Sequence, residues 1–319
     1  MVAISIMIEG QMGLTWPRWE RLCAEVEALG FAGLFRSDHF TGGAPPDQEA
    51  LETVVSLAYL ADHTRRIHFG TLVAPVSFRD PVMLARQALA LDDLSGGRFV
   101  LGLGAGWQAR EHETFGYDLG DLATRFARLE EALEVVTRLL RGDEPVSFAG
   151  RFYRLREATL LPRPQRPGGP PVLVGGSGPR RTLPLVARYA DWWNSSALDR
   201  ETFRARSARL NELLRAADRQ PGDVRRTMMR AVYFGRDPGE VERRLRGRLR
   251  PELAGQPFAA ALQTLRREER AIVGTPEEIV EQIAADGAAE VEELMLQWFD
   301  LDDLDGLRAF ATGVLPQIG

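Results

Sequence analysis

Apolar residues along the chain follow two alternating patterns, one typical of buried strands and one typical of amphipathic helices. Short apolar runs rich in β-branched residues predict strands, and segments with apolar positions three or four residues apart predict helices. In 16–29, for example, Trp19, Leu22 and Val26 fall on one helical face, and Gly30 ends the segment. We expect strands at 2–8, 33–37, 66–74, 98–106, 171–176, 190–195, 226–234 and 291–299. We expect helices at 16–29, 47–62, 80–97, 121–141, 179–189 and 200–217, another beginning at 275, and a last one that closes the chain. Asp47 is the expected N-cap of the second helix.

This alternation predicts an α/β fold, a (β/α)8 TIM barrel with insertions, formed as a single domain over residues 1–319. About eight strands, each followed by a helix, suit the size of that fold. The insertions are a hairpin-like stretch at 145–155, a Pro-rich connector at 160–171, and an Arg- and Glu-rich segment at 235–273 with helical spacing and no clear strand. A doubly wound open sheet is the alternative, but no G-x-G-x-x-G follows the first strand.

Composition restricts the chemistry further. The chain is 45% hydrophobic and 27% charged, with a net charge of −5. It has no apolar run near the ~18 residues that a membrane helix needs. All 40 basic residues are arginines dispersed among acids, which excludes lysine-based catalysis and leaves no stripe for nucleic acid. The single cysteine, Cys23, excludes a disulfide within the chain. The first residues indicate a strand rather than a signal peptide, so we expect a cytoplasmic protein without membrane or nucleic-acid partners.

The active site of such a barrel lies at the C-terminal ends of the strands, so the residues just after each predicted strand are the candidates. Glu9 follows the first strand, His39 the second, Trp107 the fourth and Trp298 the last. The segments concerned are 9–11, 37–40, 72–75, 104–107, 175–181, 194–195 and 297–300.

A glycine loop follows the fifth predicted strand. Gly175, Gly176, Ser177 and Gly178 are small enough for backbone N–H groups to turn toward a ligand, and a helix begins just behind them. Arg180 could neutralise a phosphate there, because no lysine is available. The loop therefore predicts a phosphate site, with a plain strand-to-helix turn as the alternative.

His39 is the only histidine on the predicted rim, and its imidazole could stabilise charge or shuttle a proton near neutral pH. A structural histidine bonded to the backbone is the alternative. No His-x-His or His-x-x-x-His spacing accompanies it, so we expect no metal site. No Gly-x-Ser-x-Gly elbow occurs and Cys23 lies on an apolar helix face, which disfavours a Ser or Cys nucleophile.

Three glycines, Gly102, Gly104 and Gly106, alternate in the fourth predicted strand. They leave one face of the strand without side chains. Either this makes room for a large flat ligand, or it allows tight packing inside the barrel. Trp107 would border the space as a stacking wall.

Six segments, in order and spanning nearly the whole chain, resemble the luciferase-like monooxygenase superfamily. Within it they are most similar to the hydride-transferring branch that uses the deazaflavin coenzyme F420. The segments are SDHF (37–40), GTLVAPVSFRDP (70–81), LSGGRFVLGLGAGWQAREHETFG (94–116), RFARLEEALEVV (125–136), PVLVGGSGPRRTLPLVARYADWWN (171–194) and VGTPEEIVEQI (273–283).

This resemblance implies a (β/α)8 barrel with the cofactor ring at the C-terminal mouth. It implies that His39 is the catalytic residue beside the reactive ring carbon and that Asp38 is close to the cofactor. Leu72, Val73 and Ala74 match the region where relatives carry a non-prolyl cis peptide behind the ring, which here would be the Leu72–Val73 bond.

The resemblance also assigns the two ends of the cofactor. Gly106 and Trp107 match positions that flank the ring, and Gly175 to Gly178 match the loop that cradles the cofactor phosphate, which Arg180 follows in the chain. Relatives are commonly homodimers packed through helices beside strands two to four, so we expect a homodimer.

One departure from the family concerns the substrate. The F420-dependent sugar-phosphate dehydrogenases carry a glutamate where Trp107 stands and hold the substrate phosphate with lysines, and this chain has neither. We therefore expect a small, apolar organic substrate that contacts Glu9, Phe40 and Trp298. The expected activity is F420-dependent hydride transfer. The alternatives are an FMN-dependent monooxygenase, served by a separate flavin reductase, and a cofactor-binding protein that has lost catalysis.

Overall fold

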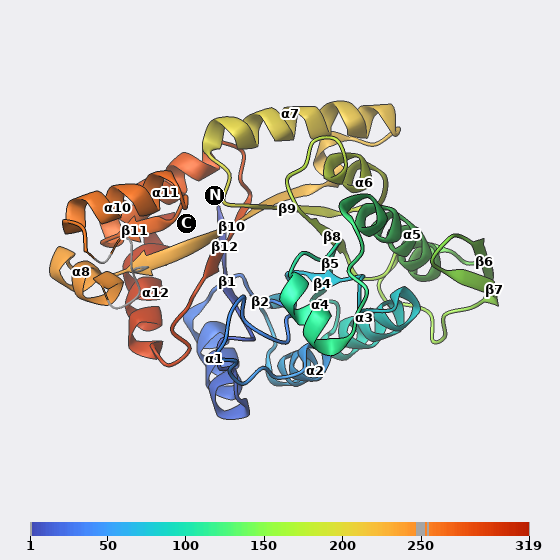
Figure 1. Cartoon of the computed structure of the whole chain (residues 1–319), viewed down its shortest axis with the longest axis horizontal. Helices are drawn as coiled ribbons and strands as arrows, with labels where there is room; N and C mark the ends of the chain where they lie inside the picture. The colour runs from blue at the N-terminus through green and yellow to red at the C-terminus, as the bar shows by residue number, and fades with distance from the viewer. Residues whose placement is uncertain (1, 247–252, 254, 319) are drawn as a thin grey trace.

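The computed structural model describes residues 2–246, 253 and 255–318 and shows a closed parallel barrel surrounded by helices (Figure 1). Neighbouring strands are all parallel, and the ring closes where the last strand pairs with the first. The (β/α)8 barrel expected from the sequence is confirmed. Its strands are, in order around the ring, β1 (Ala3–Ile8), β2 (Gly33–Arg36), β3 (His68–Thr71), β5 (Phe99–Gly104), β8 (Val172–Gly175), β9 (Trp192–Ser196), β10 (Arg225–Phe234) and β12 (Glu293–Gln297).

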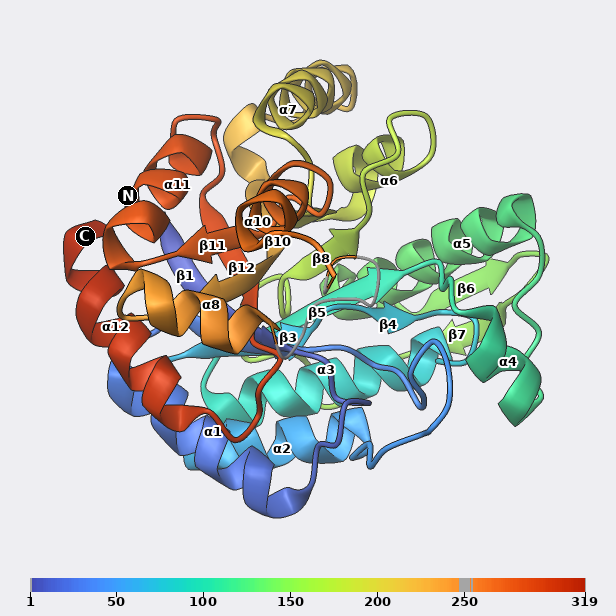
Figure 2. The ribbon, with the colours of Figure 1, turned by 60° about the vertical axis from the view of Figure 1, so that its left-hand side comes forward.

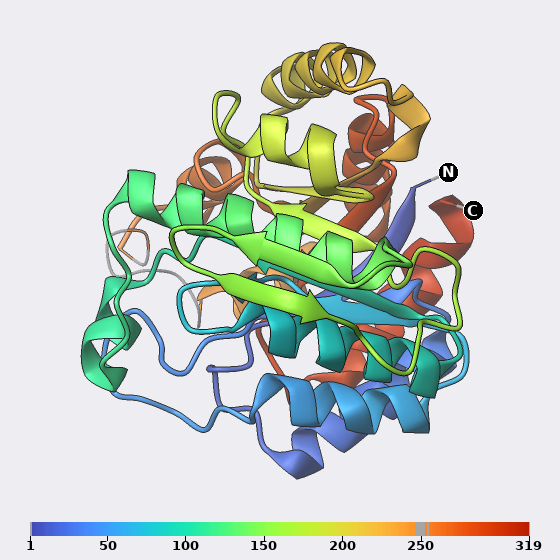
Figure 3. The same cartoon turned by 90° about the vertical axis from the view of Figure 1, so that its right-hand side faces the viewer.

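Helices cover the outside of the barrel, and the two ends of the chain lie side by side in all three ribbon views (Figures 1, 2 and 3). Most begin and end within a few residues of the sequence expectation. The outer helices are α1 (Trp16–Leu29), α2 (Thr53–His63), α3 (Pro81–Ser95), α5 (Leu122–Arg141), α6 (Thr182–Tyr189), α7 (Arg200–Ala216), α11 (Pro276–Gly287) and α12 (Leu304–Ile318).

Capping residues explain why these boundaries were predictable. The Asp80 carboxylate accepts hydrogen bonds from the N–H groups of Val82 and Met83, both at 3.0 Å, and so begins α3. Gly96 ends the same helix with φ 68°, and Gly30 ends α1 with φ 82°, a left-handed conformation that favours glycine.

The second helix differs from the expectation. It was expected over 47–62 with Asp47 as its cap, but α2 begins at Thr53, where the Glu52 carboxylate accepts from the Val55 N–H at 2.8 Å. Asp47 instead pairs with Arg110 at 2.7 Å. The Asp47 carboxylate therefore ties the loop that precedes α2 to Arg110 and does not cap the helix.

The insertion between β5 and β8 contains one helix that was not expected, α4 (Ala109–Phe115). It also contains the expected hairpin, formed by β6 (Val146–Ala149) and β7 (Arg154–Ala158), which lies outside α5 (Figure 3). A short strand, β4 (Ala74–Pro75), pairs with β5 just beyond β3.

The insertion between β10 and β12 forms a small unit against the end of β10. It contains α8 (Pro238–Arg246), α10 (Phe258–Arg267) and β11 (Ile272–Gly274), which share an apolar cluster that includes Leu245 and Leu265. No strand was expected in 235–273, so β11 corrects that prediction; three backbone positions at the end of β10 pair with it. Residues 247–252 and 254 of the segment lie outside the described residues.

The barrel interior is apolar in the middle and polar at the strand starts. Met7, Phe35, Val100, Leu173 and Met295 belong to the apolar layer. Within the described residues, no helix is both long and apolar enough to span a membrane.

A buried ionic group lies at the strand starts. The Glu293 carboxylate, fully buried, accepts from Ser5 and lies 2.7 Å from Nε2 of His68 and 3.0 Å from a guanidinium nitrogen of Arg225. Arg225 also stacks on the Trp192 ring, with its guanidinium carbon 4.8 Å from the centroid. Burial raises the pKa of Glu293, but the hydrogen bond and charge of His68, with Arg225 and Ser5, lower it below its ordinary value.

Candidate active site

A cavity of about 640 Å³ opens at the C-terminal ends of the barrel strands. That volume is in the range of small-ligand pockets. Its floor is apolar, with Met7, Leu72, Val73 and Met229, and its walls carry a few polar groups. Its lining also includes Glu9, Gln11, His39, Gly106, Trp107, Arg125, Phe126, Gly175, Gly176 and Gln297.

His39 stands on the pocket wall with one ring nitrogen bound. Its Nδ1 lies 2.9 Å from Oε1 and 3.1 Å from Oε2 of Glu111 on α4. The Glu111 side chain is 1% exposed, and that of His39 is 15% exposed. Burial lowers the pKa of His39, but the hydrogen bond and charge of Glu111, with the charges of Glu9 and Asp38, raise it above its ordinary value.

A second polar group spans the first and last strands. The amide groups of Gln11 and Gln297 donate to the two oxygens of Glu9, at 2.9 and 2.7 Å. The Ser37 hydroxyl donates to Gln11 at 2.7 Å and accepts from the Gly10 N–H. Glu9 is thus held in one orientation as a hydrogen-bond acceptor on the pocket wall.

The Leu72–Val73 peptide bond is cis, as the family resemblance implied. Its Val73 side chain occupies the space that the glycines leave. A Cβ on Gly104 would lie 2.5 Å from one Val73 methyl carbon, and a Cβ on Gly175 would lie 2.9 Å from the other. Of the two interpretations of the alternating glycines, tight packing therefore accounts for Gly104, because protein atoms occupy that face.

Gly175 and Gly176 of the glycine loop line the pocket, whereas Ser177, Gly178 and Arg180 follow them outside its lining. Gly176 has φ 128°, and its N–H and carbonyl group are bonded to Asn194 and to the Trp193 indole. Within the described residues, the N–H groups of Ser177, Gly178 and Arg180 have no acceptor. An anion-binding loop needs backbone N–H groups that are not already bonded within the protein, and these three meet that condition among the described residues.

Arg125 adds a cation that the sequence interpretation missed. It lines the pocket from the first turn of α5 and donates to the Gly106 carbonyl oxygen at 3.0 Å. Its Nε is buried and lacks a hydrogen-bond partner among the described residues. Beside it, the Phe126 ring lines the pocket and carries the Arg181 guanidinium, whose carbon lies 5.7 Å from the ring centroid.

Asp38 is buried away from the pocket lining. Its two oxygens accept from Nη2 and Nε of Arg79 at 2.7 and 2.8 Å, and Arg79 also reaches Glu52 at 2.7 Å. Burial lowers the pKa of Arg79, but Asp38 and Glu52 outweigh it and raise that pKa well above its ordinary value. Asp38 therefore anchors the backbone that carries His39, and its contact with a cofactor stays a prediction.

The aromatic candidates are divided between the pocket and its surroundings. Trp107 lines the pocket, is 67% exposed, and meets the His39 ring edge-on with centroids 5.6 Å apart. Phe40 packs on Phe78, at 4.6 Å between centroids, outside the pocket lining. Trp298 is buried against Phe310 and lines a separate hollow near α8, so the structure does not bring it to the pocket. Ala74 is also buried outside the lining.

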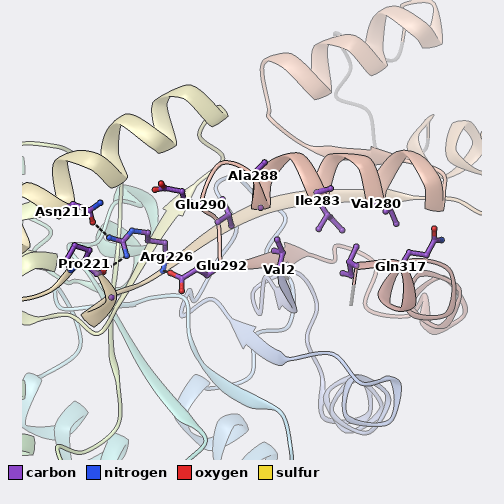
Figure 4. A pocket seen from close by; sticks show the side chains of 15 residues that line it. Val2, Asn211, Pro221, Arg226, Val280, Ile283, Ala288, Glu290, Glu292 and Gln317 are labelled. Carbon is purple, nitrogen blue, oxygen red and sulfur yellow. Dashed lines mark hydrogen bonds between the residues drawn. The ribbon is translucent and has the colours of Figure 1, made fainter.

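A second hollow, of about 760 Å³, lies at the opposite end of the barrel, where the strands begin (Figure 4). Its buried cation, Arg226, is engaged by internal partners: the Ser207 hydroxyl, the Asn211 side chain and the carbonyl oxygens of Pro221 and Val224. The cation of this hollow is therefore held by protein groups, and the pocket around His39 is the better candidate. Among the described residues, no cluster of three or more His, Cys, Asp or Glu side chains could hold a metal ion.

A sequence model of the luciferase-like monooxygenase family matches residues 5–292. The chain belongs to the luciferase-like monooxygenase family. Family membership makes it an enzyme, an oxidoreductase, and the expected superfamily is confirmed.

Two relatives show how far the luciferase-like sequence extends. An F420-dependent glucose-6-phosphate dehydrogenase of Kineococcus radiotolerans is 28% identical over 293 residues, which cover 91% of this chain and 81% of that protein. The 4-hydroxyprotoasukamycin monooxygenase of Streptomyces nodosus subsp. asukaensis is 34% identical over 181 residues, 56% of this chain. That match spans about half of the monooxygenase, 46% of its length.

Solved structures share the luciferase-like fold. An F420-dependent secondary alcohol dehydrogenase in complex with an F420-acetone adduct has a TM-score of 0.83 and 20% identity, over 100% of this chain and 99% of that one. A monooxygenase from Streptomyces bottropensis has a TM-score of 0.80 and 24% identity over the full length of both chains.

The residues absent from the predicted site include Glu111, which is bonded to His39, and Arg125, which lines the pocket. Glu111 is 72 residues from His39 along the chain, and spacing alone cannot show that α4 turns its carboxylate onto the imidazole. The only available signal was that both lie in segments of family resemblance, 94–116 and 125–136.

Proposed function

We propose that this chain is an F420-dependent oxidoreductase that transfers a hydride between the deazaflavin and a small, apolar organic substrate. The observation that carries the proposal is the His39–Glu111 pair on the wall of the pocket. A single imidazole backed by a carboxylate can take or give the one proton that accompanies hydride transfer at an alcohol or carbonyl carbon. The relative that covers 91% of the chain is named as F420-dependent, which supports the choice of cofactor.

The residues present suit a cofactor with an anionic tail. The Nε of Arg125 and the N–H groups after Gly176, which lack partners among the described residues, would hold a phosphate, together with Arg180, which follows the loop in the chain. Trp107 and the Leu72–Val73 bulge would border the ring. When bound, the deazaflavin supplies the carbon that accepts or donates the hydride.

The chain's own residues would orient the substrate and move its proton. Met7, Leu72 and Met229 make the pocket floor apolar and exclude water from it. Glu9, fixed by two amides, can accept a hydrogen bond from a polar group of the substrate. His39 holds or receives the proton at Nε2, the ring nitrogen that Glu111 does not bind.

The pocket favours an uncharged substrate over a sugar phosphate. The chain has no lysine, and Trp107 stands where the sugar-phosphate dehydrogenases carry a glutamate. Arg125, an arginine on the lining, would be engaged by the cofactor phosphate. The substrate would therefore be recognised by the apolar floor and by Glu9.

An FMN-dependent monooxygenase is the second candidate function. The 34% identity to 4-hydroxyprotoasukamycin monooxygenase favours it, although over only 56% of this chain. The same loop would hold the FMN phosphate, and a separate flavin reductase would supply reduced flavin. Comparing how tightly purified protein binds F420 and FMN tests the two proposals against each other, and we expect F420 to bind more tightly.

We also propose that the protein is a homodimer joined through α2 and α3. Val55 on α2 and Met83 on α3 are 56% and 51% exposed, each in the first turn of its helix, and these two helices contact one another. Exposed apolar side chains on adjoining helices are typical of a subunit interface. Light scattering should give twice the chain mass.

The variant Met83→Glu should lower that mass toward one chain, because a desolvated carboxylate without a partner is costly at an interface. Leu161→Glu, an equally drastic change at a 61%-exposed position in the Pro-rich connector, is the matched control and should leave the mass unchanged. An unaltered mass for Met83→Glu would place the interface elsewhere.

A further inference from the structure

We propose that Glu111 is the positioning residue that keeps the proton of neutral His39 on Nδ1 and so reserves Nε2 for proton exchange in the pocket. This inference rests on the proposed function. Both Glu111 oxygens lie within 3.1 Å of Nδ1, and Oε2 also accepts from the Phe40 N–H at 3.2 Å. The carboxylate is therefore fixed to the backbone beside His39 as well as to its ring. A carboxylate accepts hydrogen bonds, so the ring nitrogen facing it must donate.

A second histidine, His112, lies next to Glu111 on α4 and shows how a structural imidazole is hydrogen-bonded. Nδ1 of His112 donates to the Gln108 carbonyl oxygen and Nε2 accepts from the Ser77 hydroxyl, both at 2.7 Å. Both ring nitrogens of His112 are thus engaged. Nε2 of His39, in contrast, has no partner within residues 2–246, 253 and 255–318, and its ring lines the pocket. The free nitrogen is the feature that separates a proton-exchanging role from a structural one.

Three carboxylates act on the His39 ring, from three different elements. Glu111 comes from α4, Glu9 from the end of β1, and Asp38 from the loop that carries His39 itself. Glu9 is occupied by two amides and Asp38 by the bidentate pair with Arg79, so both are compensated by other donors. Nδ1 of His112 lies 4.0 Å from Glu111 but is directed to Gln108. Glu111 is the carboxylate in direct contact with His39, and it therefore controls the basicity of that ring.

This geometry lets Nε2 of His39 exchange one proton with the substrate. When an alcohol is oxidised, its O–H bond breaks and the proton passes to Nε2 of His39. The C–H bond at the same carbon would break, its electron pair leaving as the hydride that a bound, oxidised deazaflavin would accept, and the C=O bond would form. His39 then carries a proton on both nitrogens, and the Glu111 carboxylate stabilises that positive charge. In the reducing direction the same Nε2 proton returns to the carbonyl oxygen.

Nitrogen-15 NMR of the histidine rings, in protein without cofactor, tests the tautomer directly. We expect neutral His39 in the wild-type protein to carry its proton on Nδ1. Glu111→Met removes the acceptor and should abolish that preference. Glu111→Gln keeps an acceptor but removes the charge, so the His39 titration midpoint should fall by about one pH unit or more. Glu113→Gln, the same change at an exposed position of α4, is the control and should alter neither property.

Kinetics separate a positioning role from a structural one. Because Glu111 acts through His39, Glu111→Gln should lower kcat by about 10–100-fold with KM little changed, and should move the pH profile of kcat to lower pH. Glu111→Asp retains the charge and should recover part of the loss. A wild-type ring with its neutral proton on Nε2 would overturn the proposal, as would a Glu111→Gln enzyme with an unchanged titration midpoint and pH profile. The NMR result does not depend on the cofactor, so an error in the F420 assignment would leave it standing.

Discussion

Replacing His39 with alanine is expected to lower kcat by about 10²–10⁴-fold, the usual contribution of one general acid or base. The reason is that His39 is the imidazole on the pocket wall, with one nitrogen held by Glu111 and the other facing the cavity. His39 lies on the loop after β2, outside the barrel strands, and Glu111 keeps its hydrogen bond from the Phe40 N–H, so the replacement should leave the barrel folded. Steady-state kinetics, together with a cofactor titration of the same variant, would measure the effect.

The affinity for cofactor should change little, because His39 has no hydrogen bond to the phosphate loop or to Arg125 among the described residues, and Arg125 keeps its bond to the Gly106 carbonyl oxygen. His63→Ala is a suitable control, since His63 ends α2 and its side chain is 49% exposed. Turnover by His39→Ala equal to that of the wild type would remove the proposed proton step. Loss of cofactor binding, without loss of turnover per bound cofactor, would show that His39 holds the cofactor instead.

Replacing Glu293 with glutamine should destabilise the fold by about 1–3 kcal/mol, because it removes the buried carboxylate that Ser5, His68 and Arg225 face. The carboxylate sits at the strand starts between Ser5, His68 and Arg225, with no exposure to solvent. Urea unfolding of the two proteins would measure the difference. Glu281→Gln, at an exposed position of α11, is the control and should cost less than about 0.5 kcal/mol.

This loss should depend on pH. Because the folded protein lowers the pKa of Glu293, its ionised form stabilises the fold at pH values above the unfolded-state pKa near 4.3. That stabilisation is lost as the pH falls through the lower, folded-state pKa. The difference in the free energy of unfolding between the wild type and Glu293→Gln should therefore be constant near neutral pH and should become smaller in acid. A difference in unfolding free energy below about 1 kcal/mol at pH 7 would show that the buried ionic group contributes little to stability.

The barrel could be predicted from the sequence because the signals that define it are local. Asp80 and Gly96 mark the ends of α3 by capping chemistry that any reader of the sequence can recognise. The start of α2 was misplaced because two acids, Asp47 and Glu52, compete for one capping role. Only the tertiary pairing of Asp47 with Arg110 decides between them. β11 was missed because three residues paired with the end of a longer strand give no periodic signal of their own.

The site was predictable only as far as position along a strand determines it. His39 and Trp107 follow strand ends and line the pocket, as expected. Phe40 and Trp298 also follow strand ends, yet their side chains pack on Phe78 and Phe310, because direction depends on neighbours far away in the sequence. Glu111 was missed for the same reason.

Equilibrium binding of F420 and of FMN to the purified wild-type protein tests the central claim most directly. We expect the protein to bind F420 saturably and one-to-one, and to bind FMN markedly less tightly. Arg125→Gln should weaken F420 binding, whereas His39→Ala should bind F420 as tightly as the wild type. Tight binding of FMN with no measurable binding of F420 would contradict the proposed function and leave the flavin monooxygenase in its place.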